Sequence, residues 1–338
     1  MPPRKSKAKT GPKAKEPAKE VAGEEESSDG VASTGEDAKE QIPTDPKPTS
    51  TEEPPSKKRK NAAPTDNPQK APRRSGRGAP ASRPSQEQLL HYMLSPTAQE
   101  LCRPADETAD LAHRGPIRTY SSSILNPYEE LLCAVILSRP ISHRLGLRTI
   151  RTVLNEPYNF SSAKATRDAG SEKRHQALWD ARTQHKDKTA EQIGSLAEVV
   201  MERFTSGDDE DGSRMQRVRE ECEGDVAKER EYMQKSVKGL GKTGLSIFFR
   251  RVQWLWDESY PFIDDRTVES LRKLGLPEDG EELRELVELR WGELDTKDLA
   301  GDDDSMRKRR ALVTVLERAI GSDLEGKHEA LLEAAAGS

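Results

Sequence analysis

Two glycines separated by a single residue, Gly239-Leu240-Gly241, constrain the fold of this chain more than any other feature. Glycine has no Cβ, so a turn built from this segment can bring its backbone amides close to a phosphate. Helical patterns before Gly239 and from Gly244 to Trp256 predict a tight turn between two helices. The acidic pair Asp264-Asp265 follows the second helix. This spacing indicates a phosphate-binding hairpin with a carboxylate one helix away.

Composition divides the chain near residue 84. Residues 1–84 contain no Phe, Trp or Tyr and hold 14 of the 22 prolines. Such a segment cannot bury enough apolar surface to offset the entropy of ordering its backbone. We therefore expect 1–84 to be a disordered, basic, Pro-rich tail. Its formal charge is +5, whereas the remainder carries −10.

The tail contains a run of four basic residues, Lys57-Lys58-Arg59-Lys60. A short Lys/Arg run flanked by proline and polar residues is typical of a nuclear localisation signal. The alternative is a solvated charge run that no receptor reads. We expect the protein in the nucleus.

Other classes of protein are disfavoured by what the chain lacks. No apolar run is long enough to span a bilayer, and the charged, Pro-rich N-terminus is unlike a secretory signal. Cys102, Cys133 and Cys222 have no metal-binding spacing, which indicates reduced thiols in an intracellular protein. We expect no membrane partner and no metal site.

From Ser85 onward the apolar pattern is helical, and no alternating stretch indicates a sheet. The sequence predicts an all-α fold, built as one large helical domain or as two small helical lobes. Ser85 is expected to cap one helix, and Asn126-Pro127 to open another with Pro127 in its first position. Thr189 is expected to cap a further helix.

The domain is expected to span 85–324. Residues 205–224, which include the acidic run Gly207–Ser213, are interpreted as an acidic loop. Residues 325–338 are interpreted as a C-terminal tail.

The hairpin, 237–243, suits a helix-hairpin-helix that grips DNA. The amides of Gly239, Leu240 and Gly241 and the start of the second helix would face a phosphate, and the helix dipole would favour its charge. Lys242 and Thr243 would lie at the same contact, with Leu240 anchoring the turn in the core. Gly241-Lys242-Thr243 also ends a Walker A phosphate loop, but that loop needs a glycine where Ser236 stands. A plain Gly-rich turn between packed helices remains the other alternative.

Three segments in this order resemble the helix-hairpin-helix DNA glycosylase superfamily of the endonuclease III type. They are the opening helix Asn126–Ser138, the hairpin 237–243, and Pro261–Val268, which is similar to the family's Val-Asp-Thr-His-Val segment. The resemblance covers roughly 120–320. It implies a glycosylase-like helical fold, double-stranded DNA as the partner, and a monomer.

By the same resemblance, Asp264 matches the family's catalytic aspartate. Its implied role is to stabilise positive charge on the sugar as a flipped base departs, or to activate a water. The alternative is that Asp264 or Asp265 only caps the following helix. Asp265 stands where the family has a small polar residue, which leaves open which of the two acids is functional.

Departures from the family pattern narrow the expected chemistry. Thr243 occupies the position of the lysine with which bifunctional members cleave the strand, and Lys242 lies one residue early. Ala134 stands where adenine-removing members have a glutamate. No cysteine follows Cys222, so no iron–sulfur cluster is expected. A monovalent cation at the hairpin is the one cofactor left open.

Two arginines are further candidates for DNA contact. Arg139 lies beside Pro140, which occupies the usual position of a strand-inserting glutamine, and Arg266 follows the acidic pair. A second basic patch, Arg307–Arg310, either faces phosphate or is a solvated surface. His143, His175 and His185 show no metal-ligand spacing.

Two functions follow. The resemblance favours a monofunctional DNA glycosylase of base-excision repair, which hydrolyses the N-glycosidic bond of a flipped damaged or mismatched base. The alternative is a non-catalytic DNA-binding or chromatin-associated protein that retains the fold.

Overall fold

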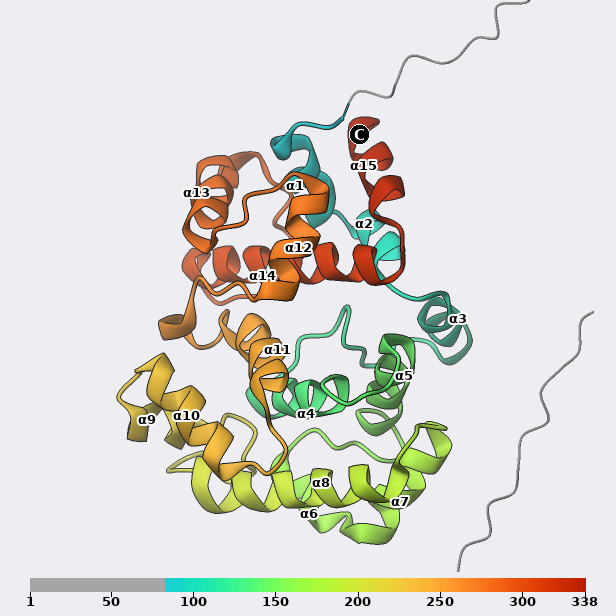
Figure 1. The fold of residues 1–338 in the computed structure, drawn as a ribbon, viewed down its shortest axis with the longest axis vertical. Coiled ribbons are helices and arrows are strands. Elements are labelled where there is room, and N and C mark those ends of the chain that lie inside the picture. Colours follow the sequence, from blue (N-terminus) through green and yellow to red (C-terminus); the bar gives the residue numbers. More distant parts are fainter. Residues whose placement is uncertain (1–82) are drawn as a thin grey trace, which may run out of the picture. The chain divides into compact units, whose positions relative to one another are not determined.

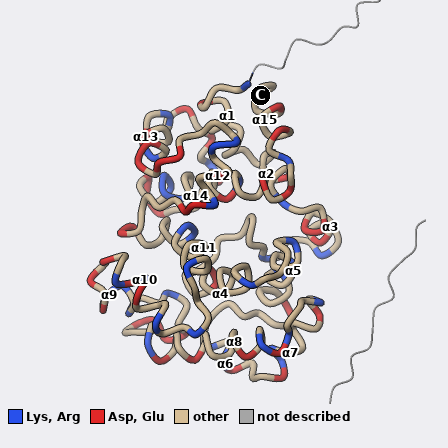
Figure 2. The backbone as a smooth tube through the Cα atoms, in the orientation of Figure 1, with Lys and Arg blue, Asp and Glu red and all other residues tan. Residues whose placement is uncertain are grey.

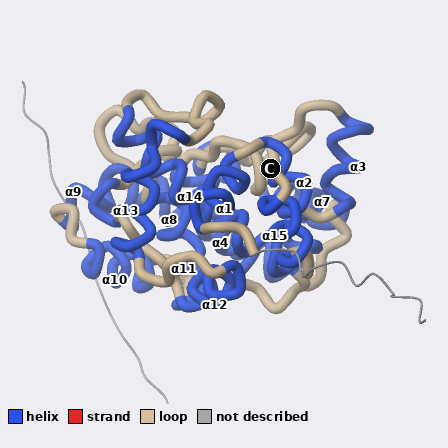
Figure 3. The backbone as a smooth tube through the Cα atoms, turned by 90° about the horizontal axis from the view of Figure 1, so that it is seen from above, coloured by secondary structure: helices blue, strands red, loops and turns tan. Residues whose placement is uncertain are grey.

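The computed structural model describes residues 83–338, which belong to one compact unit, 74–338. Every regular element in this range is a helix, and none of these residues forms a strand (Figures 1 and 3). The predicted all-α class is therefore confirmed for the described residues. The expected disordered tail and the signal Lys57–Lys60 lie outside them, except for Arg83 and Pro84.

The helices are arranged around two hydrophobic cores. One core unites the first and last described helices, and we call this part the terminal lobe; Leu90, Leu312 and Leu331 are at its centre. Its helices lie together in the upper part of Figure 1: α1 (Gln86–Leu94), α2 (Pro96–Cys102), α12 (Asp265–Leu274), α13 (Gly280–Arg290), α14 (Asp304–Leu324) and α15 (His328–Ala336).

The second core lies between residues 120 and 256, and we call this part the central lobe. Leu132, Ile193 and Phe248 are fully buried in it. Its helices fill the lower part of Figure 1: α4 (Pro127–Leu137), α5 (His143–Val153), α6 (Ala163–Asp168), α7 (Gly170–Asp180), α8 (Lys186–Val199), α9 (Gln216–Cys222), α10 (Val226–Ser236) and α11 (Lys242–Val252).

Helix α3 (Ala105–Arg114) follows α2 and is held by charge rather than by apolar packing. The guanidinium of Arg151 on α5 donates to Asp106 at 2.7 Å and to Asp110 at 2.9 Å. Arg151 is almost fully buried, and Glu107 lies 3.3 Å from it. Through Arg151, α3, which leads from the terminal lobe to the central lobe, is attached to α5.

Two predicted helix starts are confirmed. Ser85 and Asn126 each accept a hydrogen bond from the backbone three residues on, and each completes a capping box with the residue there. Pro127 occupies the first turn of α4 as expected. The expected cap at Thr189 is wrong, because α8 begins three residues earlier after the left-handed His185, and the Thr189 hydroxyl donates back to the His185 carbonyl.

Two segments expected to be irregular contain helices. Residues 325–338 are not a tail, because Leu331, Leu332 and Ala335 give α15 an apolar face that packs on α1. Within 205–224, α9 forms because Val218 and Cys222 are buried on one of its faces.

Candidate nucleic-acid-binding site

The connection between α10 and α11 is the tight turn that the glycines predict. Gly239 has φ +84°, and a Cβ there would lie 2.8 Å from the Gln192 amide nitrogen, so only glycine fits without strain. Leu240 is buried in the core of the central lobe, which confirms its predicted anchoring role.

The start of α11 is open to solvent. Gly241 is the residue before the helix, a Cβ placed on it would meet no atom within 4 Å, and no side chain among the described residues caps the first turn. Lys242 and Thr243 are exposed. The first amides of α11 and the positive end of its dipole are thus available to an anion from outside the chain.

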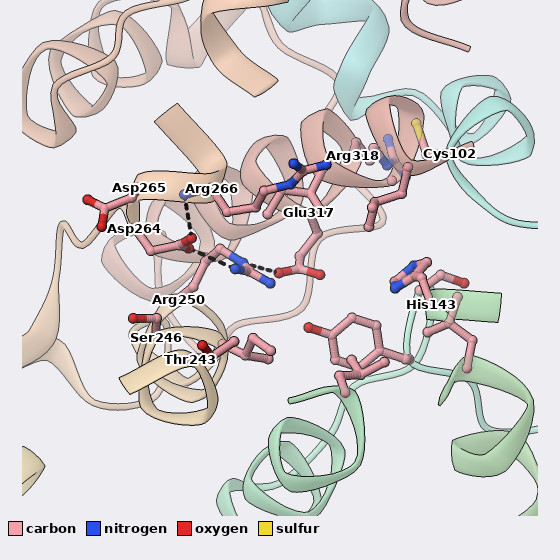
Figure 4. Close-up of a pocket in the computed structure, with 18 of the residues that line it drawn as sticks. Cys102, His143, Thr243, Ser246, Arg250, Asp264, Asp265, Arg266, Glu317 and Arg318 are labelled. Atoms are coloured by element: carbon pink, nitrogen blue, oxygen red, sulfur yellow. Dashed lines mark hydrogen bonds and ion pairs between the residues drawn. The ribbon is translucent and has the colours of Figure 1, made fainter. Parts of the chain in front are cut away.

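A cleft of about 590 Å³ lies beside this helix start, between the two lobes. Thr243, Ser246 and Arg250 line it from α11, at the i, i+3 and i+7 positions of one helix face (Figure 4). Asp264, the residue before α12, and Glu317 of α14 also line it. The structure therefore brings the hairpin helix and the predicted acid to the same cleft.

Asp264 caps α12, and its carboxylate is fully engaged. One oxygen accepts from the amides of Arg266 and Thr267 at 3.1 and 3.3 Å. The other accepts from Arg250 Nη1 and from the Thr267 hydroxyl, each at 2.7 Å. Burial opposes ionisation, but Arg250 and these hydrogen bonds outweigh it and lower the pKa of Asp264, which is an anion at neutral pH.

Arg250 joins Asp264 to a buried ion-pair network. Its Nε donates to Glu317 at 2.7 Å, and the neighbouring Arg251 donates twice to Glu130 on α4, at 2.9 Å each. The Arg251 side chain also lies 3.6 Å from Glu317. These ion pairs connect α11 and α4 of the central lobe with α12 and α14 of the terminal lobe.

Sequence reasoning missed this network. Its signal was present: Arg250-Arg251 interrupts an otherwise apolar stretch of α11, and Glu130 stands within the apolar helix α4. Charges inside apolar helical segments are seldom buried unless they pair with one another. That rule identifies these residues as a set but does not say which arginine meets which acid.

The rim of the cleft distinguishes the two neighbouring acids. Asp265 is 94% exposed and lies 3.4 Å from Lys242 Nζ, whereas Asp264 points inward toward Arg250 (Figure 4). Lys242 thus bridges the rim from the hairpin to α12, and Thr243 lies on the inner side. Both acids line the cleft, Asp264 from its interior and Asp265 from its exposed rim.

The two candidate arginines lie on either side of this region. Arg139 is half-buried and donates to Gln192, whose amide nitrogen lies 3.4 Å from the Lys238 carbonyl of the hairpin. Arg266 lines the cleft from α12, is exposed and pairs with Asp323 at 3.0 Å. Both are close to the predicted contact, one behind the hairpin and one on the rim.

The run Arg307–Arg310 on α14 makes contacts within the chain. Arg307 and Arg309 donate to the carbonyls of Thr296 and Trp254, and Lys308 and Arg310 lie over the rings of Trp291 and Trp254. Each of the four basic side chains therefore has an intramolecular contact.

Charge is segregated among the helices. Helix α13 has four Glu against two Arg, whereas α5 and α11, which line the cleft, contain Arg or Lys and no acidic residue (Figure 2). The hairpin helix α11 itself therefore carries only basic charge.

The described residues also bear on a metal site and on a membrane segment. Among residues 83–338, no group of three or more His, Cys, Asp or Glu side chains is arranged to hold a metal ion. No helix in the same range is long and apolar enough to cross a membrane.

Known proteins provide no further guidance. The chain was compared with models of protein families, with curated proteins and with solved structures, and none of the three comparisons finds a match.

Proposed function

We propose that this protein is a monofunctional DNA glycosylase of base-excision repair, which acts in the nucleus on double-stranded DNA. The observation that carries the proposal is that one cleft is lined both by the open start of α11 and by the ionised carboxylate of Asp264. A phosphate held at the first amides of α11 would set the adjoining sugar of a flipped nucleotide against that carboxylate.

The chemistry follows from the state of the acid. An anion held rigidly by two backbone amides and Thr267 stabilises the positive charge that develops on the sugar as the glycosidic bond breaks. The volume of the cleft lies within the usual range for small-molecule sites, which accommodates a nucleoside. Thr243 offers no amine at the inner side of the cleft, so strand cleavage through a lysine Schiff base is not part of the proposal.

A second candidate, a DNA-binding protein without catalysis, is favoured by one observation. Asp264 is mostly buried, and the Arg250 guanidinium occupies one of its oxygens. A cation at this distance weakens the field that the acid exerts on a sugar. Under this alternative, the hairpin binds duplex DNA and the acid serves only the fold.

Base release from duplexes with single lesions tests the two candidates. The wild-type protein is expected to release at least one base, and Asp264→Asn to lose that activity by about 100-fold or more. Asp265→Asn is the matched control, because its carboxylate is exposed at the rim, and it should keep most of the activity. Wild-type protein that binds duplex DNA but releases no base from any lesion would establish the second candidate.

A further inference from the structure

The wall of the cleft opposite Asp264 carries a histidine that the ion-pair network leaves unused. His143 is the first residue of α5, and Figure 4 shows it across the cleft from Arg250 and Glu317. Leu137, Ile141 and Leu147 line the cleft on the same side. No hydrogen bond or ion pair to another residue of 83–338 holds its imidazole, which is therefore available to a ligand.

The charges around His143 come from three other helices. Glu317 and Glu325, on and just after α14, raise its pKa, while Arg250 of α11 and Arg266 of α12 lower it. Burial is the largest influence, and the net result is a pKa below the ordinary value of histidine. The imidazole is neutral at neutral pH, with one nitrogen that donates a hydrogen bond and one that accepts.

The geometry of a nucleotide points its base toward this wall. Phosphate and base are attached at different positions of the sugar, so a phosphate at the start of α11 and a sugar beside Asp264 leave the base to extend across the cleft. The groups that line the cleft there include the apolar side chains and His143, together with Tyr120 and Ser121.

We propose that His143 is a catalytic residue that donates a hydrogen bond to the departing base. The inference rests on the proposed glycosylase function. In that reaction the C1′–N bond breaks and its electron pair leaves with the base. The oxygen of a water bonds to C1′, and the proton that the water loses ends on the base. Asp264 then stabilises the positive sugar, and His143 stabilises the negative charge that develops on the base.

This role predicts that the effect of removing His143 depends on which base leaves. A hydrogen bond that strengthens as the base gains negative charge matters most for bases that leave with difficulty and least for bases that leave easily. Removal of the donor should therefore change the ratio of rates between substrates. A residue that only fills space would change all rates by the same factor.

The experiment is single-turnover base release by wild type, His143→Leu and His143→Gln. The duplexes form two series ordered by the ease with which the base leaves: 5-fluorouracil, uracil and thymine; 7-methylguanine, hypoxanthine and adenine. His143→Leu is expected to slow the most reluctant base that wild type releases roughly 10- to 100-fold more than the easiest one. His143→Gln, which keeps an N–H donor, should restore part of that difference.

Binding to a duplex with a tetrahydrofuran abasic analogue is the control, since that duplex has no base to contact. Its affinity should be unchanged in both variants, and His91→Leu, an exposed histidine of α1, should match wild type throughout. Equal slowing of every substrate, or lost affinity for the abasic duplex, would overturn the role of His143 alone. A wild-type protein that releases no base from these series or from any other lesion duplex would overturn the glycosylase function and this inference together.

Discussion

Two helix starts meet at the cleft, and they are built in opposite ways. Helix α11 begins after Gly241, which has no side chain, and its first turn is uncapped and open to solvent. Helix α12 begins after Asp264, whose carboxylate accepts hydrogen bonds from the amides of Arg266 and Thr267. The positive end of the helix dipole is therefore free at α11, whereas at α12 the carboxylate of Asp264 neutralises it.

The difference shows that a helix start can serve two purposes, to bind a ligand's anion or to hold an acidic side chain of the protein in its charged form. An open helix start can bind the anion of a ligand, such as a phosphate. A closed one keeps the protein's own anion ionised and fixed in direction, because amides and Arg250 stabilise the charged form of Asp264. The following variants test each half of this contrast, from the largest expected effect to the smallest.

Arg250→Leu should break the closed start. It leaves Asp264 and Glu317 buried without their shared guanidinium, so the free energy of unfolding should fall by about 3–5 kcal/mol in urea denaturation. Arg272→Leu is the control, because both side chains of its ion pair with Glu278 are exposed, and it should lower the free energy of unfolding far less. A loss equally small for Arg250→Leu would mean that the helix amides alone hold the acid.

Asp264→Asn should change how the free energy of unfolding depends on pH, because it removes the charge that caps α12. The folded-state pKa of Asp264 is below its ordinary 3.8, so its charge stabilises the fold above that pH, and the stabilisation is lost as pH falls through the folded value. The wild type should exceed the variant by about 2 kcal/mol at pH 7 and at pH 5, and the difference should shrink below about pH 4. A difference that vanishes already between pH 7 and 5 would contradict the lowered pKa.

The two hairpin glycines separate folding from DNA binding. Gly241→Ala should change the free energy of unfolding by less than about 1 kcal/mol, because space is open around its Cβ, yet weaken binding to duplex DNA about 10-fold by obstructing the phosphate. Gly239→Ala should unfold more readily, because of its positive φ and the nearby Gln192. Undiminished affinity in folded Gly241→Ala would place the phosphate elsewhere.

Lys242→Ala should give the smallest effect, at the rim of the open start. Loss of one phosphate contact lowers the slope of log affinity against log salt by roughly one and weakens all duplex sequences alike. Its side chain is 82% exposed, so stability should be almost unchanged. Fluorescence anisotropy over a salt series measures the slope, and a sequence-selective loss would argue against a phosphate contact.

Features set by neighbouring residues were predictable from the sequence. The helix starts at Ser85 and Asn126, the turn at Gly239 and the inward Leu240 follow from local patterns, and the structure confirms them. Helix α15 was not predicted because it has only nine residues, too few for its apolar side chains to repeat several times at helical spacing. Its alanines and leucines, all strong helix formers, were the available signal.

Features that join distant segments were not predictable. Arg250 pairs with Asp264 on α12 and Glu317 on α14, and nothing in the intervening sequence specifies those partners. The sequence does not decide between one domain and two lobes, because a helical period shows which face is buried and not against what. In the sequence, the distance of His143 from the other histidines argues only against a metal site. Its position opposite Asp264 depends on how α5 packs, which the sequence does not show.

The division of the terminal lobe between both ends of the described chain determines the order in which the cores are completed during synthesis. The core of the central lobe lies in one uninterrupted stretch, 120–256, and is whole once that stretch has left the ribosome. The apolar faces of α1 and α2 are made earlier, but their partners on α14 and α15 are translated after the central lobe. A nascent chain thus carries Leu89, Leu90 and Met93 uncovered until α14 and α15 have been made, which is after the central lobe can fold.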